Sequence, residues 1–230
     1  MLTGFDGFSK KGYRWKRTRH SQHGKQNLDS KALKQADLAT LILAAQEGHI
    51  DLKYGDESGF CLTSPVSYSY SKIGTQKRLE QFKTRYGSRL SILGIWQPDQ
   101  SFDYALVQGS FSKERYVKVM TWIAQRAAQT LAETGRLTVV VQDNGSSHTS
   151  HFSRSSWEGW REQGLYLFFL PPCCSEMNPI EGQWHQLKTH EIAGELFDNE
   201  YDLAMAVMTG MENRSQIAGY TLERFMFKSA

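Results

Sequence analysis

Apolar and polar residues alternate in parts of the chain with the two-residue period of β-strands. Residues 49–64, HIDLKYGDESGFCLTS, alternate up to Tyr54 and then contain Gly55 and Gly59. This pattern predicts two strands joined by a turn near the glycines. RLSILGIW, at 89–96, predicts a third strand, which ends before a proline.

Two further segments are continuously apolar, which is typical of strands buried on both faces of a sheet. RLTVVVQD, at 136–143, is rich in β-branched residues and predicts a central strand. LYLFFLPP, at 165–172, predicts a fifth strand that its prolines end.

Other segments repeat apolar residues at helical spacing. Residues 31–47 and 112–135 each carry one apolar stripe and stop at a glycine, and Ser112 is suited to cap the second helix. Shorter helices are predicted at 153–163, 178–192 and 200–213. From the first strand on, the order is β, β, β, α, β, α, β, α, α. This order predicts an α/β fold, a mixed five-stranded sheet flanked by helices.

Composition restricts the classes of protein. A chain of 230 residues that is 40% apolar can bury a core of one or two domains. No apolar run reaches the roughly 18 residues of a membrane span, so we expect no membrane association. The first twenty residues lack the apolar stretch of a secretory signal. Cys61, Cys173 and Cys174 have no zinc-site spacing and are expected to be free thiols of a cytoplasmic protein.

Charge divides the chain at about residue 34. Residues 1–34 hold nine Lys and Arg against two Asp, a net charge of +7, whereas the rest has a net charge of −4. This basic arm is suited to a DNA backbone, although a solvated N-terminus explains it equally well. The candidate DNA contacts in the arm are Lys10, Lys11, Arg14, Lys16, Arg17 and Arg19. We therefore predict an arm at 1–34 and a second domain at 35–230.

Three carboxylates stand at the ends of predicted elements: Asp56, Asp143 and Glu181. Functional sites of α/β sheets gather at the carboxyl ends of strands. Clustered carboxylates repel one another, and divalent cations remove that repulsion. Oxygen ligands without His or Cys favour Mg²⁺ or Mn²⁺ over zinc. Two such ions about 3.5–4 Å apart can hold the attacking and leaving oxygens of a phosphoryl transfer.

Each acid also has an ordinary structural explanation. Asp143 in DNGS is suited to an Asx-turn. In NPIE, Asn178 and Glu181 have the spacing of a helix capping box. Asp56 is followed by Glu57, and only strand parity and the nearby Gly59 favour Asp56. The spacing of these acids does not prove that they converge.

Three sequence blocks resemble a known family. DESGFCLTSP, VVVQDNGSSHTS and LYLFFLPPCCSEMNPIEGQWHQLK closely resemble the blocks of DDE transposases from bacterial insertion sequences, relatives of the Tc/mariner superfamily. The third block is the most specific, and the resemblance runs from about residue 12 to about residue 200. The 37 residues between Asp143 and Glu181 are close to the spacing of that superfamily.

The resemblance implies a ribonuclease H-like fold in which Asp56, Asp143 and Glu181 are catalytic and bind two Mg²⁺ ions, with Mn²⁺ as a substitute. It implies cleavage of double-stranded DNA at transposon ends and strand transfer into target DNA, in the bacterial cytoplasm with the nucleoid. His148, His185 and Lys188 are further candidate DNA contacts. On a helix opened by Glu181, His185 and Lys188 share its face. Ile180, Trp184 and Leu187 are expected to pack in the core.

The sequence departs from the family in its N-terminal part and in one loop. Relatives begin with a helix-turn-helix region, of which KKGYRWKRTRHSQHGKQN resembles only the tail. A homodimer, or a partner that supplies this module, is therefore expected. PPCCSEMNP has Cys173, Cys174 and Ser175 where Tyr-Ser-Pro is usual, and Gly145 replaces a common Ala.

Two other functions fit the same residues. A catalytically inactive, truncated transposase would bind DNA or interfere with assembly of a full-length protein, and its DNA binding would be salt-sensitive. Another ribonuclease H-like nuclease, such as a resolvase or an RNA–DNA hybrid nuclease, is the third interpretation. Strand joining and a panel of substrates would separate the three.

Overall fold

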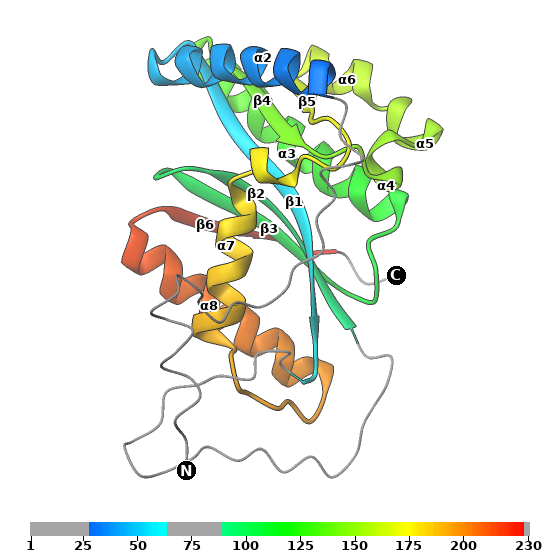
Figure 1. Ribbon diagram of the computed structural model, residues 1–230, viewed down its shortest axis with the longest axis vertical. Helices are drawn as coiled ribbons and strands as arrows, with labels where there is room; N and C mark the ends of the chain where they lie inside the picture. The colour runs from blue at the N-terminus through cyan, green and yellow to red at the C-terminus, as the bar shows by residue number, and fades with distance from the viewer. Residues whose placement is uncertain (1–27, 64–88, 228–230) are drawn as a thin grey trace, which may run out of the picture.

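The computed structural model describes residues 28–63 and 89–227 of the chain (Figure 1). Its centre is a six-stranded sheet in the order β5-β4-β1-β2-β3-β6. The strands are β1 (Ile50–Cys61), β2 (Arg89–Gln97), β3 (Ser101–Gln108), β4 (Leu137–Gln142), β5 (Leu165–Phe169) and β6 (Thr221–Phe225). β1, β2 and β3 are antiparallel neighbours, whereas β4 pairs with β1 and with β5, and β6 with β3, in parallel. The sheet is therefore mixed, and the α/β class is confirmed.

The turn expected between Gly55 and Gly59 is wrong, because β1 runs through both glycines as one strand. Each glycine is paired with β2 and leaves room for a side chain from β2. A Cβ atom on Gly55 would lie 2.9 Å from Cδ1 of Ile95, and one on Gly59 would lie 2.6 Å from Nε of Arg89. The glycines permit close side-chain packing here. In a sequence, glycines that allow packing within a strand look the same as glycines that form a turn.

Two strands, β3 and β6, were not expected, and two expected strands are the single strand β1, so the count of five is corrected to six in the described residues. β3 follows β2 through a tight turn in which Asp99 has a φ of 58°. It lacks clear alternation because nearly all of its side chains are buried. β6 is short and largely exposed at the edge of the sheet, so it has no apolar pattern to detect.

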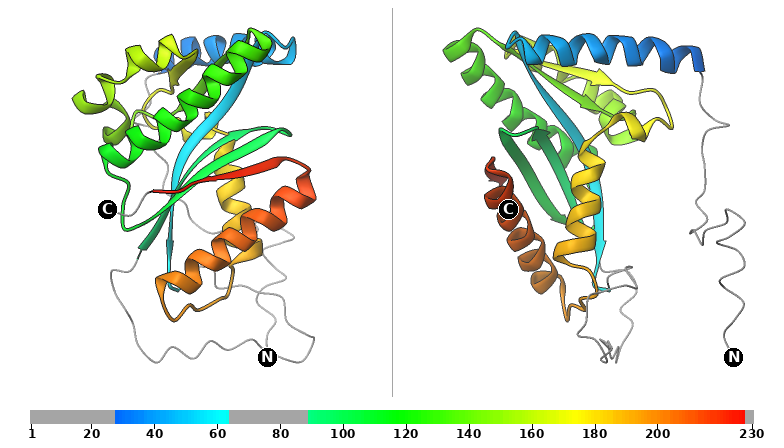
Figure 2. Two further views of the ribbon diagram at one scale, coloured as in Figure 1. Left: turned by 180° about the vertical axis from the view of Figure 1, so that it is seen from behind. Right: turned by 60° about the vertical axis from the view of Figure 1, so that its left-hand side comes forward.

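Helices cover both faces of the sheet (Figure 2). α3 (Lys113–Thr134) and α6 (Trp157–Glu162) pack on one face around Tyr116. α2 (Leu28–Gln46), α7 (Ile180–Gln186) and α8 (Glu200–Ala218) pack on the other face around Trp184. The remaining short elements are α4 (Ser146–Thr149), α5 (His151–Arg154), η2 (Ser175–Met177) and η3 (Leu187–Glu191).

The long helices agree with the sequence analysis. Ser112 caps α3 by accepting a hydrogen bond from the Arg115 backbone at 3.3 Å, and Gly135 ends the helix with a φ of 73°. α2 is one continuous helix across residue 34, where the sequence analysis placed a boundary. No helix in the described parts of the chain combines the length and apolarity needed to cross a bilayer. The three cysteines are free thiols.

Candidate active site

Asp56 lies in the middle of β1, on the sheet face that α7 covers. Its Oδ2 accepts a hydrogen bond of 3.0 Å from the indole Nε1 of Trp184. Burial and, less strongly, the negative charges of Asp143 and Glu181 raise the pKa of Asp56 to about 7. The three acids expected to form the site are therefore electrostatic neighbours, although they come from separate parts of the chain.

Asp143 follows the last residue of β4, and one of its two carboxylate oxygens, Oδ1, contacts neighbouring groups. Oδ1 accepts a hydrogen bond of 3.0 Å from the backbone N–H of Gly145, which confirms the Asx-turn. The same oxygen lies 2.8 Å from Nδ1 of His148, and this contact is the main reason that the pKa of Asp143 is lowered. The side chain is 59% exposed, so a fixed, ionised carboxylate faces solvent.

His148 is buried behind Asp143. Its side chain is 4% exposed, its ring stacks on Tyr116 at 4.6 Å, and Nε2 lies 3.4 Å from Oε1 of Glu57. Burial alone would lower the pKa of His148, but its contacts with Asp143 and Glu57 raise it to about 9. His148 was expected to contact DNA, whereas the structure places its ring between two carboxylates, away from the surface.

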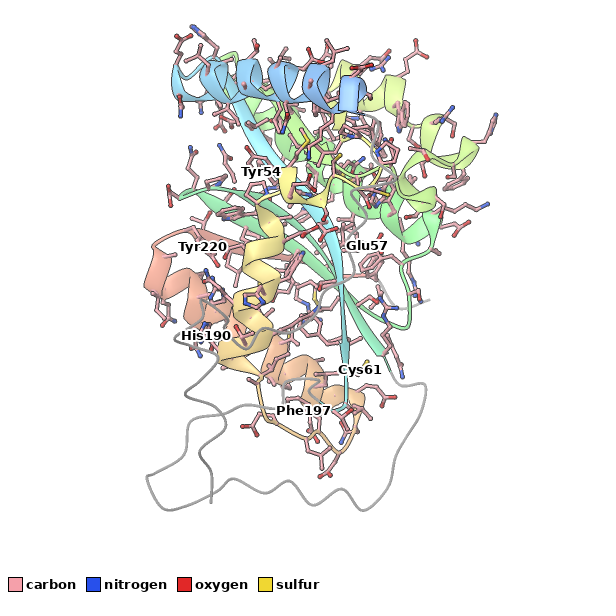
Figure 3. All side chains as sticks on the ribbon, in the orientation of Figure 1. Tyr54, Glu57, Cys61, His190, Phe197 and Tyr220 are labelled. Atoms are coloured by element: carbon pink, nitrogen blue, oxygen red, sulfur yellow. The ribbon has the colours of Figure 1, made fainter. Side chains whose placement is uncertain are left out.

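Strand parity separates the adjacent acids Asp56 and Glu57. Side chains alternate between the two faces of a strand, so Asp56 meets Trp184 on one face and Glu57 meets His148 on the other. Figure 3 shows Glu57 at the middle of β1. Asp56 is thus the β1 acid that shares a face with α7, as parity predicts.

Glu181 lies in the exposed first turn of α7. The capping box expected in NPIE does not form, because α7 has no side-chain cap. Instead, the amide of Asn178 donates a hydrogen bond of 2.9 Å to the carbonyl oxygen of Gly55 in β1. This bond ties the loop before Glu181 to the residue that precedes Asp56.

Trp184 makes the second tether between α7 and β1. It is 4% exposed, and its ring packs edge-on against Phe102 at 5.6 Å, which confirms the expected core position. The ring also lies directly on Gly94, where a Cβ atom would come within 2.5 Å of Cη2 of Trp184. Gly94 is the cross-strand partner of Asp56, so this close approach brings the indole N–H to the carboxylate.

The sequence analysis missed the polar role of Trp184. A buried indole N–H needs an acceptor, and Trp184 is three residues after Glu181, on the same helix face. Those two facts were available in the sequence. The acceptor was not, because Asp56 is 128 positions away along the chain.

Lys188 follows α7, and its ammonium lies 5.2 Å from the ring centre of Phe60. Burial lowers the pKa of Lys188, while the charge of Asp56 acts in the opposite direction. His185 is exposed on α7. The six candidate contacts of the basic arm lie outside the described residues: Lys10, Lys11, Arg14, Lys16, Arg17 and Arg19.

The three acids form an all-oxygen donor set. Within residues 28–63 and 89–227, no three His, Cys, Asp or Glu side chains have the close arrangement of a formed metal site. Burial is the main reason that the pKa of Asp56 is raised, and the charges of Asp143 and Glu181 add a repulsion that a divalent cation would neutralise. The donor chemistry and electrostatics of Asp56, Asp143 and Glu181 therefore fit Mg²⁺ or Mn²⁺.

Comparison with known proteins assigns the family. Residues 51–204 match the family model described as DDE superfamily endonuclease. The chain belongs to this family. The matched region contains Asp56, Asp143 and Glu181. No curated protein sequence matches the chain.

Solved structures show the same fold as this chain. The Mos1 mariner paired end complex with Mn has a TM-score of 0.60 at 16% identity, with 93% of this chain and 67% of that chain covered. The Mos1 strand transfer complex has a TM-score of 0.59 at 16% identity, with 93% and 66% covered. The catalytic domain of Mos1 mariner transposase has a TM-score of 0.52 at 13% identity, with 89% and 95% covered. These matches confirm the ribonuclease H-like fold.

Proposed function

We propose that this chain is the catalytic domain of a transposase, which cleaves DNA at transposon ends and transfers the strands into target DNA. The observation that supports the proposal is the placement of three acids, Asp56 in β1, Asp143 after the end of β4 and Glu181 in α7, in a fold similar to that of the Mos1 transposase catalytic domain. Burial and, after it, the charges of Asp143 and Glu181 raise the pKa of Asp56.

Asp56, Asp143 and Glu181 would hold two Mg²⁺ ions, with Mn²⁺ as an alternative. Mos1 complexes have been solved with Mg and with Mn. When bound, such ions activate the attacking oxygen and stabilise the leaving oxygen of a phosphodiester. Asp56 must lose its proton to become a ligand, and its pKa of about 7 allows this near neutral pH.

The chain's own residues orient the carboxylates. His148 and the Gly145 backbone hold Oδ1 of Asp143, which directs the rest of the carboxylate toward solvent. Trp184 fixes Oδ2 of Asp56. Hydrogen bonds of this kind set the direction of ligands around a site and tune their affinity.

Double-stranded DNA is the proposed substrate and partner. The similar Mos1 structures include a paired-end complex with the left transposon end. His185 and Lys188 are proposed to contact the phosphate backbone beside the acids, and the basic arm is proposed to contact it as well. A second copy of the chain, or a partner with a helix-turn-helix domain, would supply recognition of the element's ends. Such a protein would work at the nucleoid of the bacterial cytoplasm.

Cleavage assays test the proposal directly. Purified protein is incubated with supercoiled plasmid and with labelled transposon ends, in Mg²⁺, in Mn²⁺ and in EDTA. We expect metal-dependent nicking and joining, and Asp143→Asn should lower the rate by about 100-fold or more, because it removes a charged ligand. Glu133→Gln, which changes an exposed acid of α3, is the control and should leave the rate unchanged.

Nicking that survives Asp143→Asn unchanged would overturn the assignment of the site. Salt-sensitive DNA binding without cleavage in any metal would instead support the inactive, assembly-interfering protein. Cleavage of RNA–DNA hybrids or branched DNA without strand joining would support another nuclease of the same fold.

A further inference from the structure

The loop of residues 170–179 leads from β5 to the helix that carries Glu181. Its first residue is tied to the end of β4, because the side-chain amide of Asn144 donates a hydrogen bond of 2.6 Å to the carbonyl oxygen of Leu170. Asn144 follows Asp143 in the sequence. The loop therefore begins next to one of the three acids.

The end of the loop is tied to β1 through η2, a short hydrogen-bonded turn. The backbone N–H of Met177 donates to the carbonyl oxygen of Cys174 at 3.1 Å, and that of Asn178 donates to Ser175 at 2.8 Å. The side-chain amide of Asn178 then binds the carbonyl oxygen of the residue before Asp56. Because η2 and Asn178 form one bonded unit, a shift of η2 also shifts the start of α7.

One side of α2 lies against β5 and against this loop (Figure 1). Lys31, Lys34 and Leu38 have the spacing i, i+3 and i+7, which places them on the same side of the helix. The ammonium of Lys34 lies 4.4 Å from the ring centre of Phe168 in β5. Leu38 is buried in the same core cluster as Leu170. This side of α2 is therefore packed against the segment that leads to α7.

Lys31 contacts η2 directly. Its ammonium lies 2.5 Å from Oε1 of Glu176, the middle residue of η2. The side chain of Lys31 is 16% exposed and that of Glu176 is 50% exposed, so the ammonium is the more enclosed partner. Ion pairs near a surface add little to the stability of the whole protein. The effect of this ion pair is therefore expected in the position of the loop.

We propose that Lys31 and Glu176 are positioning residues for Glu181. The ion pair fixes η2 against α2 and thereby holds the start of α7 where Glu181 can share a metal ion with the other two acids. The inference rests on the proposed function and deepens it, because it assigns a role in the metal site to a helix that supplies no proposed ligand. Both residues act through the loop, and neither is itself a proposed ligand.

The first experiment measures Mn²⁺ binding by isothermal calorimetry, without DNA. Lys31→Gln and Glu176→Gln should each lower the affinity about twofold to fivefold, which is the factor that a surface ion pair can contribute. Lys31→Arg should keep most of the affinity, because the ion pair is retained. The charge swap, Lys31→Glu combined with Glu176→Lys, should restore most of it for the same reason.

Asp51→Asn is the matched control for the loss of an ion pair. Asp51, in β1, lies 3.1 Å from Nε of Arg136, the residue before β4, and this pair is also partly buried. Its loss should leave the Mn²⁺ affinity unchanged. Wild-type affinity in Lys31→Gln and Glu176→Gln, or a charge swap that binds no better than they do, would overturn the proposal. An unmodified protein that binds no Mn²⁺ would instead refute the proposed function, so the two failures are distinct.

The native cysteines report on the loop without metal or DNA. Cys174 is buried next to η2, whereas Cys61 is exposed at the end of β1. Alkylation by N-ethylmaleimide is followed at each cysteine by mass spectrometry. Lys31→Gln should accelerate the reaction of Cys174 about twofold to fivefold and leave Cys61 unchanged. Asp51→Asn should affect neither cysteine, and an unchanged rate at Cys174 in Lys31→Gln would show that Lys31 does not hold the loop.

Cleavage kinetics separate positioning from a DNA contact, because Lys31 also belongs to the arm of residues 1–34 that is expected to bind DNA. A positioning role predicts that Lys31→Gln and Glu176→Gln both lower kcat and leave the KM for DNA unchanged. A DNA contact would raise KM in Lys31→Gln alone and would not be restored by the charge swap. That result would overturn the proposal.

Discussion

At the scale of single residues, the candidate site depends on which atom of each carboxylate is held. Asp143 is held at Oδ1 by a backbone N–H and by an imidazole, and Asp56 is held at Oδ2 by an indole. The donors are buried or fixed by the backbone, whereas the side chain of Asp143 is 59% exposed. Under the proposed function, metal affinity would depend on residues that are not themselves ligands.

His148→Ala tests this support for Asp143. We expect the free energy of unfolding to fall by about 1–3 kcal/mol, because a buried hydrogen-bonding group is lost. We also expect the affinity for Mn²⁺ to fall about tenfold, since Asp143 loses its orientation. Urea unfolding and isothermal calorimetry measure the two effects. His49→Ala, at a side chain that is 71% exposed, should change neither, and an unchanged Mn²⁺ affinity in His148→Ala would contradict the role.

Trp184→Phe tests the support for Asp56. The phenyl ring keeps most of the packing but cannot donate to Oδ2, so metal affinity should fall about tenfold while stability falls by about 1 kcal/mol. Trp160→Phe is a matched control on the other face of the sheet. Trp160 is also buried and donates to Thr121 at 3.2 Å, so its loss should lower stability similarly and leave metal affinity intact. Equal metal affinities in the two variants would argue against a positioning role.

At the scale of elements, α7 owes its place to two contacts with β1 and to one glycine in β2. The amide of Asn178 binds the Gly55 carbonyl before the helix starts, and Trp184 binds Asp56 one turn into it. Glu181 lies between these two tethers. Figure 1 shows α7 lying beside β1 and in front of β2.

Gly94→Ala tests the packing of α7 against β2. The added methyl group would lie 2.5 Å from Trp184 and 2.7 Å from Phe102, and neither buried ring has space to move away freely. Overpacking of this kind should lower the free energy of unfolding by about 1–3 kcal/mol and should reduce cleavage. Gly159→Ala in α6 meets no atom within 4 Å and is the control. It should be neutral or stabilising, because alanine favours the helix by about 0.5–1 kcal/mol. Wild-type stability in Gly94→Ala would show that the close contact between Trp184 and Gly94 does not hold α7 in place.

At the scale of the whole molecule, a metal ion would join three segments that are distant in the sequence. Asp56, Asp143 and Glu181 come from β1, the end of β4 and α7, so a ligand that binds all three stabilises the folded chain as a unit. In the metal-free protein the charge of Asp56 opposes folding, because the pKa of Asp56 is raised.

The pH dependence of stability follows from the raised pKa of Asp56. The folded protein favours the protonated form of Asp56. The stability that Asp56 contributes is therefore complete below pH 3.8 and is lost as the pH rises through about 7. The pKa of His148 is raised from 6.5 to about 9, so His148 also contributes stability that is lost as the pH rises, at higher pH than for Asp56. Mg²⁺ should therefore raise Tm more at pH 8 than at pH 5.5, because its ligand is then deprotonated.

Differential scanning calorimetry with Mg²⁺ and with EDTA at both pH values measures this effect. In Asp56→Asn, the rise in Tm caused by Mg²⁺ should be nearly the same at pH 5.5 and at pH 8. This result distinguishes the contribution of Asp56 from that of His148. Should Mg²⁺ raise Tm equally at pH 5.5 and pH 8, Asp56 is not a ligand. Should it raise Tm equally in Asp143→Asn and in the unmodified chain, the three acids do not share a metal site.

The sequence by itself determined the local features. The apolar periodicity located α3 and β4, Ser112 and Gly135 marked the ends of α3, and free thiols followed from the spacing of the cysteines. The resemblance of three blocks to DDE transposases named the family that residues 51–204 match. These features depend on neighbours within a few residues, where helix capping and side-chain periodicity act.

Only the tertiary structure decided which of these features meet. Gly55 and Gly59 lie within a single strand because β2 pairs with both, and β3 and β6 exist because distant strands complete their hydrogen bonds. His148 is buried because Glu57 and Tyr116, far away in sequence, enclose it. Burial and hydrogen-bond partners are set by contacts between segments that folding alone brings together, so no local pattern records them.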